Sequence, residues 1–419
     1  MVLRHWILSC LAILLFVATG CSSGRPSKDI QTAELLRSQA KWEEAITAYD
    51  LAIKANPKLA QAYIGRSTAL RALGRYEQAL ADAEKAVGLA PKSPLAFGNR
   101  ATALKFLSRY DDALADANRA IELDGSNALA YDTRASIFSS KSQYDRAVSD
   151  ASRAIELDPR LSPAYESRAT AYLGLGQCEK AIADASKAIE LDAANALAYW
   201  VRSGCYRRTR QLDNASGDAT KAIEVSKNTA VLGLAYQERA RVYGLMGQHE
   251  KSVADATKAI ELSPKEATNL GIRAAAYSDW GQHDQQAIDD ATVVIELNPM
   301  ADVLAFAYVI RGRSYNRLGK PDQAIDDATK AIASAPTLAL AYETRGLAYA
   351  RLRQYQRALP DFTRKIELEP EQQSYLNRAA AHFCLGSSMD ADADIQKAIA
   401  LGADATRIEA LRRTASQQC

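Results

Sequence analysis

Apolar and small positions along the chain recur with the spacing of paired helices. Within residues 162–195, Tyr165, Ala169 and Tyr172 fall at i, i+4 and i+7, which places them on one face of a helix. Gly176 follows at a point where a left-handed backbone can end a helix. A second helical set comes next, consisting of Ala181, Ala185, Ala188 and Ile189. The pattern predicts two amphipathic helices joined by a short turn, that is, an antiparallel hairpin.

This hairpin pattern returns about every 34 residues between Ala33 and Ala403. Units of this length stack, because each hairpin leaves apolar flanks that only a neighbour can cover. One position of the second helix is small in every unit: Ala45, Ala79, Ala113, Ala147, Ala181, Ala215, Ser252, Ala287, Ala324, Ala358 and Ala391. Proline stops the second helix in most units: Pro57, Pro91, Pro159, Pro264, Pro299, Pro336 and Pro370. The small column predicts close contact between helices.

On these aromatic, small, glycine and proline positions the chain resembles a tetratricopeptide repeat protein. The resemblance implies an all-α fold, a right-handed α-solenoid of about eleven helical hairpins over residues 30–403. Residues 404–419 leave the pattern, and we expect a C-terminal capping helix and tail there. Asp404 can cap that helix, and Ile408 and Leu411 can cover the final hairpin.

The period slips at three places. About three extra residues enter at 230–232 and again at 302–304, and one more enters near Gln285. Each three-residue insertion predicts a first helix longer by nearly a turn. The insertions are either tolerated extensions or local changes of superhelix geometry that shape the groove.

Two columns of charge accompany the repeats. The basic column is Arg66, Arg100, Arg134, Arg168, Arg202, Arg239, Arg273, Arg311, Arg345 and Arg378. The acidic column is Asp82, Asp116, Asp150, Asp184, Asp218, Asp255, Asp290, Asp327, Asp361 and Asp394. Their spacing from core positions turns both columns toward the packed side. We expect an Arg–Asp ladder within or between hairpins; a ligand-binding charge array is the alternative.

The first residues carry the features of an export signal. An apolar run of about eleven residues, 7–17, is too short to cross a bilayer and suits a signal-peptide core. It ends in small residues before Cys21, and a polar tether over residues 21–29 follows. This segment resembles a bacterial lipoprotein signal peptide over residues 1–20. The resemblance implies cleavage between Gly20 and Cys21, lipidation of Cys21 (palmitate among the acyl chains), and an outer-membrane location favoured by Ser22. A simple secretory signal or an uncleaved anchor remains open.

The remaining chemistry does not indicate an enzyme. Net charge is +2, which calls for neither nucleic acid nor an acidic membrane surface. We find no paired metal ligands, no phosphate loop and no catalytic triad order, and we expect no cofactor. The six cysteines are irregularly spaced and describe no disulfide framework, and we expect none between Cys178 and Cys205.

In the tetratricopeptide family the concave groove is lined by the first helix of each hairpin. Carried over, candidate groove residues are Trp200, Arg207, Arg208, Arg241, Arg313, Arg317 and Arg351. Arginines suit acidic protein or peptide segments, because guanidinium binds carboxylates bidentately; alternatively, they merely solvate an open surface. We therefore expect a lipid-anchored envelope scaffold for protein partners. A structural subunit of a secretion, pilus or outer-membrane assembly machine, or an adaptor regulating a cell-wall enzyme, is the alternative.

Overall fold

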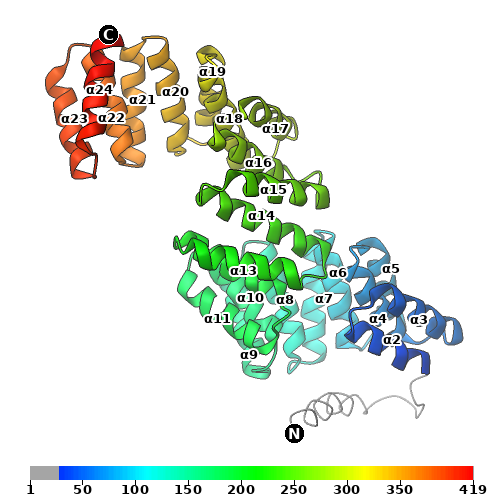
Figure 1. The fold of residues 1–419 in the computed structure, drawn as a ribbon. Coiled ribbons are helices and arrows are strands. Elements are labelled where there is room, and N and C mark those ends of the chain that lie inside the picture. The colour runs from blue at the N-terminus through cyan, green and yellow to red at the C-terminus, as the bar shows by residue number, and fades with distance from the viewer. Residues whose placement is uncertain (1–27, 419) are drawn as a thin grey trace, which may run out of the picture. The chain divides into compact units, whose positions relative to one another are not determined.

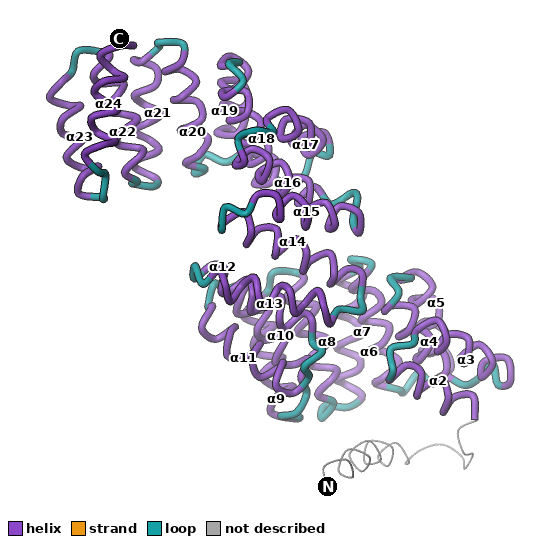
Figure 2. Tube along the Cα trace, viewed as in Figure 1, coloured by secondary structure: helices purple, strands orange, loops and turns teal. Residues whose placement is uncertain are grey.

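The computed structural model describes residues 28–418, and this part of the chain consists of 23 helices without a strand. Figure 2 shows the helices following one another through short loops. The all-α prediction is confirmed. The described residues divide into two compact units, with the boundary between Lys141 and Ser142.

The first unit holds α2–α8, coloured blue to cyan in Figure 1. Its helices are α2 (Lys28–Ser38), α3 (Trp42–Ala55), α4 (Ala60–Ala72), α5 (Tyr76–Leu89), α6 (Pro94–Phe106), α7 (Tyr110–Leu123) and α8 (Ala128–Ser140). The hairpins α2/α3, α4/α5 and α6/α7 pack one against the next.

The second unit repeats the same arrangement from α9 to α24. Its helices are α9 (Tyr144–Leu157), α10 (Ser162–Gly174), α11 (Cys178–Leu191), α12 (Ala196–Arg208), α13 (Leu212–Val225), α14 (Thr229–Leu245), α15 (His249–Leu262), α16 (Ala267–Trp280), α17 (Asp284–Glu296), α18 (Ala301–Arg317), α19 (Pro321–Ser334), α20 (Ala339–Arg351), α21 (Tyr355–Leu368), α22 (Gln372–Cys384), α23 (Ser388–Ala400) and α24 (Ala405–Gln418). Even-numbered helices from α10 to α22 are the first helices of their hairpins, and each contacts the next even-numbered helix.

The core of each unit is built from small side chains. Every alanine of the predicted small column is fully buried, and Ser252, which replaces it in α15, is 1% exposed. The Ser252 hydroxyl donates to the backbone carbonyl of Ala240, so the substitution leaves no unpaired polar group. Glycine extends the same principle in α20, where a Cβ on Gly346 would lie 2.7 Å from the Phe362 ring. Close packing of thin layers therefore depends on the absence of side-chain bulk.

The Arg–Asp ladder is confirmed within hairpins. Arginine Nε and Nη2 donate to the two carboxylate oxygens at 2.6–2.9 Å. The pairs are Arg66–Asp82, Arg100–Asp116, Arg168–Asp184, Arg202–Asp218, Arg239–Asp255, Arg273–Asp290, Arg311–Asp327, Arg345–Asp361 and Arg378–Asp394. These bidentate hydrogen bonds raise the pKa of the arginines above its ordinary value. The charge columns thus join the two helices of one layer.

The same arginines also reach the preceding layer. In the second unit, Nη1 donates to a hydroxyl two positions after the preceding aspartate of the column, at 2.9–3.4 Å. The acceptors are Ser152, Ser186, Thr220, Thr257, Thr292, Thr329 and Thr363. One guanidinium therefore holds two hairpins together.

The insertions lengthen the first helices as predicted. α14 and α18 each have 17 residues, against 13 in α12 and α20. The extra residue near Gln285 leaves the ladder intact, because Arg273 and Asp290 still pair across a separation of 17 positions rather than 16.

At the C-terminal end, α24 packs against α22. The Asp404 carboxylate accepts a hydrogen bond from the Arg407 amide, and Ile408 and Leu411 pack on the core of the α22/α23 hairpin. This is the capping arrangement that the sequence indicated.

The predicted signal peptide, its cleavage site at Gly20 and the lipidation residue Cys21 lie outside the described residues. None of the helices in residues 28–418 combines the length and apolar character needed to cross a bilayer. Cys178 and Cys205 are buried free thiols, as expected, whereas Cys384 is disulfide-bonded, which the cysteine spacing did not indicate.

Candidate functional site

The predicted groove residues all lie on first helices of the second unit. Their positions are Trp200, Arg207 and Arg208 on α12, Arg241 on α14, Arg313 and Arg317 on α18, and Arg351 on α20. The structure brings them together as two groups: one on α12 and α14, and one around α18 and α20.

On α12 and α14 two guanidinium groups share one carboxylate. Arg207 Nε donates to Glu238 Oε1 at 2.6 Å, while Arg241 Nη1 lies 3.7 Å from Glu238 Oε2. The Glu238 side chain is 2% exposed, whereas that of Arg241 is 33% exposed. Burial lowers the pKa of Arg241, and the neighbouring Arg207 adds to this effect. The cluster therefore carries one positive charge more than its carboxylate neutralises, and Arg241 holds it.

The other two predicted α12 residues make contacts within the protein. Arg208 Nη1 donates to the Leu173 carbonyl at 2.6 Å, which ties α12 to α10. Trp200 packs partly buried on the core that includes Val201, and its buried Nε1 has no hydrogen-bond partner among the described residues. Both residues have structural contacts that account for their position.

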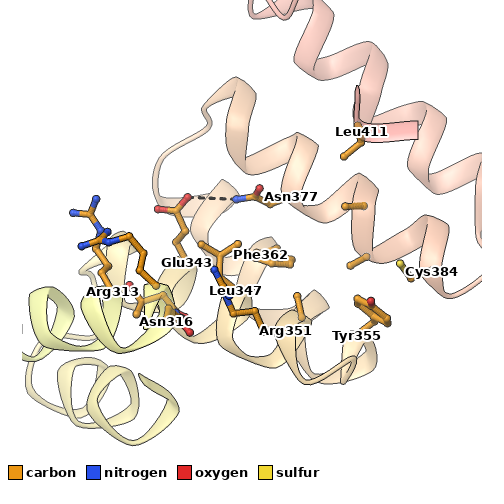
Figure 3. A pocket seen from close by; sticks show the side chains of 15 residues that line it. Arg313, Asn316, Glu343, Leu347, Arg351, Tyr355, Phe362, Asn377, Cys384 and Leu411 are labelled. Atoms are coloured by element: carbon orange, nitrogen blue, oxygen red, sulfur yellow. Dashed lines mark hydrogen bonds between the residues drawn. The ribbon is translucent and has the colours of Figure 1, made fainter. Parts of the chain in front are cut away.

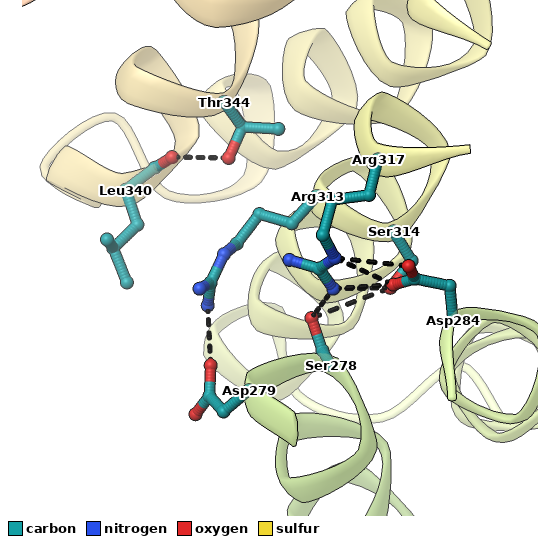
Figure 4. A network of polar contacts seen from close by, with 8 residues as sticks. All are labelled: Ser278, Asp279, Asp284, Arg313, Ser314, Arg317, Leu340 and Thr344. Atoms are coloured by element: carbon teal, nitrogen blue, oxygen red, sulfur yellow. Dashed lines mark hydrogen bonds and ion pairs between the residues drawn. The ribbon is translucent and has the colours of Figure 1, made fainter. Parts of the chain in front are cut away.

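The α18 arginines are neutralised by acidic residues of the preceding hairpin, as Figure 4 shows. Arg313 Nη1 lies 3.1 Å from Asp279 Oδ1. Arg317 donates to Asp284 Oδ1 at 2.6 Å and to the Ser278 hydroxyl at 2.7 Å. The basic character expected of this region is therefore largely compensated.

A cavity of about 450 Å³ lies next to these residues, lined by α18, α20, α21, α22 and α24 (Figure 3). Arg351 lines it, is exposed, and has no ion pair with any described residue. Glu343 and Asn377 are joined across it by a hydrogen bond of 3.4 Å. Leu347 and Phe362 supply apolar surface. The cavity thus combines an apolar lining with a few polar groups, as ligand pockets commonly do.

Reasoning from sequence missed the acidic partners and the cavity. Glu238 and Asp279 each stand at a position that is acidic in no other repeat, and the position of Glu343 is acidic elsewhere only at Asp132 and Glu166, so no continuous column indicates them. Helical spacing from the predicted arginines was the available signal: Glu238 is three positions before Arg241, on the same face of α14. No group of His, Cys, Asp and Glu in residues 28–418 is arranged to hold a metal ion.

Solved structures with the same fold cover nearly all of the chain. A chain in the crystal structure of the APC/C hetero-tetramer Cut9–Hcn1 is 12% identical, with a TM-score of 0.55 over 97% of this chain and 98% of that chain. The human IFIT1 dimer with m7Gppp-AAAA is 16% identical, with a TM-score of 0.54 over 91% and 92% of the two chains. At these identities the similarity establishes the fold alone. No curated relative matches the sequence.

Family models point the same way. Two models described as tetratricopeptide repeat match residues 30–94, 167–226 and 309–372, and residues 234–266. These segments together span more than half of the chain and fall in both units. With the stacked hairpins and the shared fold, they show that the chain belongs to the tetratricopeptide repeat family.

Proposed function

We propose that this protein is a lipid-anchored scaffold of the bacterial cell envelope that binds protein or peptide partners along its first helices. The tetratricopeptide fold itself suggests protein–protein interaction and is generally non-catalytic. The observation that carries the proposal is Arg241 on α14, which shares the Glu238 carboxylate with Arg207 and is neutralised only in part, since such a partly buried guanidinium is suited to an acidic segment of a partner.

Anchoring rests on the resemblance of residues 1–20 to a lipoprotein signal and on the thiol of Cys21. A Cys21→Ser variant is expected to lose incorporation of labelled palmitate and to leave the membrane fraction. If the variant still incorporates palmitate and stays in the membrane fraction, lipid anchoring at Cys21 is refuted.

Partner binding is tested by placing a photo-crosslinking amino acid at position 241 in cells that carry the native gene. The matched control carries it at Lys258, which is exposed on the second helix α15. We expect a discrete adduct from position 241 alone, which weakens when the partner's acidic residues are neutralised. Equal labelling from both positions, or no labelling from position 241, contradicts partner binding in the groove. A stoichiometric complex that survives detergent would instead favour the machine subunit.

A further inference from the structure

The cavity between α20 and α22 lies where the stack of the second unit is loosest. Among successive first helices from α10 to α22, this pair packs least closely. The opening exposes Leu347 of α20, which is 38% exposed, above the buried ring of Phe362 on α21. Ala381 of α22 and Leu411 of α24 complete the apolar wall. An aliphatic chain entering here would cover surface that the protein leaves open to water.

Two residues that line this cavity carry a hydrogen-bond acceptor without adequate donors. Asn316 is 6% exposed, and its Nδ2 donates to the Thr344 carbonyl at 2.9 Å, but its buried Oδ1 has no partner among the described residues. A buried acceptor left unpaired costs about 1–3 kcal/mol, which a ligand donor would relieve.

The second acceptor is the carboxylate of Glu343. It receives one long hydrogen bond, 3.4 Å from Asn377, and burial raises its pKa above the ordinary value. The cations in its vicinity are committed elsewhere: Arg313 pairs with Asp279, and Lys365 pairs with Glu369 and with a second glutamate. Glu343 therefore presents negative charge that the protein compensates incompletely.

We propose that this cavity binds the side chain of a lysine from a partner protein, with its ammonium group at Glu343 and Asn316 and its aliphatic stem on Leu347 and Phe362. An ammonium supplies three donors and one positive charge, which match a carboxylate and an amide oxygen. A carboxylate at this end of the cavity would instead meet two acceptors, while the unpaired Arg351 lies eight positions further along α20. This inference rests on the proposed function, and it adds a cationic anchor to the acidic segment expected at Arg241.

The test uses capped single amino acids as probes with the full chain. Saturation-transfer NMR titrations compare N-acetyl-lysine methylamide with the norleucine and glutamate analogues, which keep the backbone and change the charge. We expect the lysine probe to bind at least tenfold more tightly than either analogue. In Glu343→Gln, which keeps the shape of the side chain, this preference is expected to fall below twofold. The control Glu367→Gln changes an exposed glutamate that pairs with Arg364 on α21, and is expected to keep the preference.

Several outcomes would overturn the inference. Equal binding of lysine and norleucine makes the cavity simply apolar, and tighter binding of glutamate makes it an anion site. A lysine preference that survives Glu343→Gln places the probe elsewhere, and absence of saturation transfer from all probes leaves the cavity without a ligand. Circular dichroism of each variant shows whether the fold is retained. Crosslinking from position 241 is an independent result, so a failure of partner capture and a failure of lysine binding are distinguishable.

Discussion

Asp327→Ala is the sharpest test of how the ladder stabilises the layers. Asp327 of α19 is the least exposed carboxylate of the ladder, at 4%, and its partner Arg311 of α18 is 16% exposed. The substitution removes hydrogen bonds of 2.7 and 2.8 Å and leaves Arg311 with the Thr292 hydroxyl at 3.1 Å and the Tyr308 ring. The guanidinium stays charged in a site from which water is mostly excluded.

The expected cost follows from these contacts. Breaking a fully buried ion pair by removing one partner costs about 3–5 kcal/mol. Arg311 retains some exposure and two weaker contacts, so we expect the free energy of unfolding to fall by about 2–4 kcal/mol. Because each layer of a solenoid contacts mainly its neighbours, the loss should be local to α17–α20.

Hydrogen–deuterium exchange resolves that locality, and urea unfolding followed by circular dichroism gives the magnitude. Asp326→Ala is the matched control, since Asp326 is the exposed neighbour on the same helix and is expected to change stability by less than about 0.5 kcal/mol. If Asp327→Ala behaves like the control, the pair contributes nothing and the ladder argument fails. Exchange that rises uniformly over the chain would refute the local coupling.

Three further tests, which use four substitutions, probe other features. Burial lowers the pKa of Arg71 to about 10, and its buried Nε has no partner among the described residues, so Arg71→Met should stabilise by about 1–2 kcal/mol in thermal unfolding; destabilisation would contradict this. Burial raises the pKa of Glu343, so its charged form opposes folding; Glu343→Gln should be the more stable protein at pH 7, with the difference disappearing near pH 3.5, and a pH-independent difference would be contrary evidence. Gly346→Ala should cost about 1–3 kcal/mol by forcing the Phe362 ring aside, while Gly98→Ala, with no atom within 4 Å, should stabilise by about 0.5–1 kcal/mol; equal effects would rule out overpacking.

The fold could be predicted from the sequence because each layer repeats the same constraints. Ala181 and Ala324 could be assigned to close helix contacts because the same position is small in every unit. The pairing of Arg with Asp was predictable for the same reason, although only the structure shows that Nη1 of Arg202 also reaches Ser186 of the preceding hairpin. Either serine or threonine accepts this hydrogen bond in the second unit, so the acceptor position always carries a hydroxyl although the residue type varies.

The candidate site was much less predictable, because it depends on residues that break the repeat. Arg313 and Arg317 looked like free positive charge, yet Asp279 and Asp284 lie against them across a hairpin boundary. A spacing of some thirty residues between partners carries no periodic signal when the pair occurs once. The cavity depends similarly on the loose packing of α20 against α22, which no local pattern encodes.

The irregular positions also distinguish residues that stabilise the layers from residues that can recognise a partner. A guanidinium held by an aspartate of its own layer recurs throughout the stack, so it can distinguish no partner from another. Arg241 and Glu343 differ, because each is partly desolvated, carries incompletely matched charge, and stands at a position that is charged in only a few repeats. Burying such charges costs stability unless a ligand compensates them. A partner that presents an acidic group to the first and a lysine to the second would relieve both costs, and one with the charges reversed would increase them. Specificity in this scaffold is therefore expected to follow the order of charges along the partner.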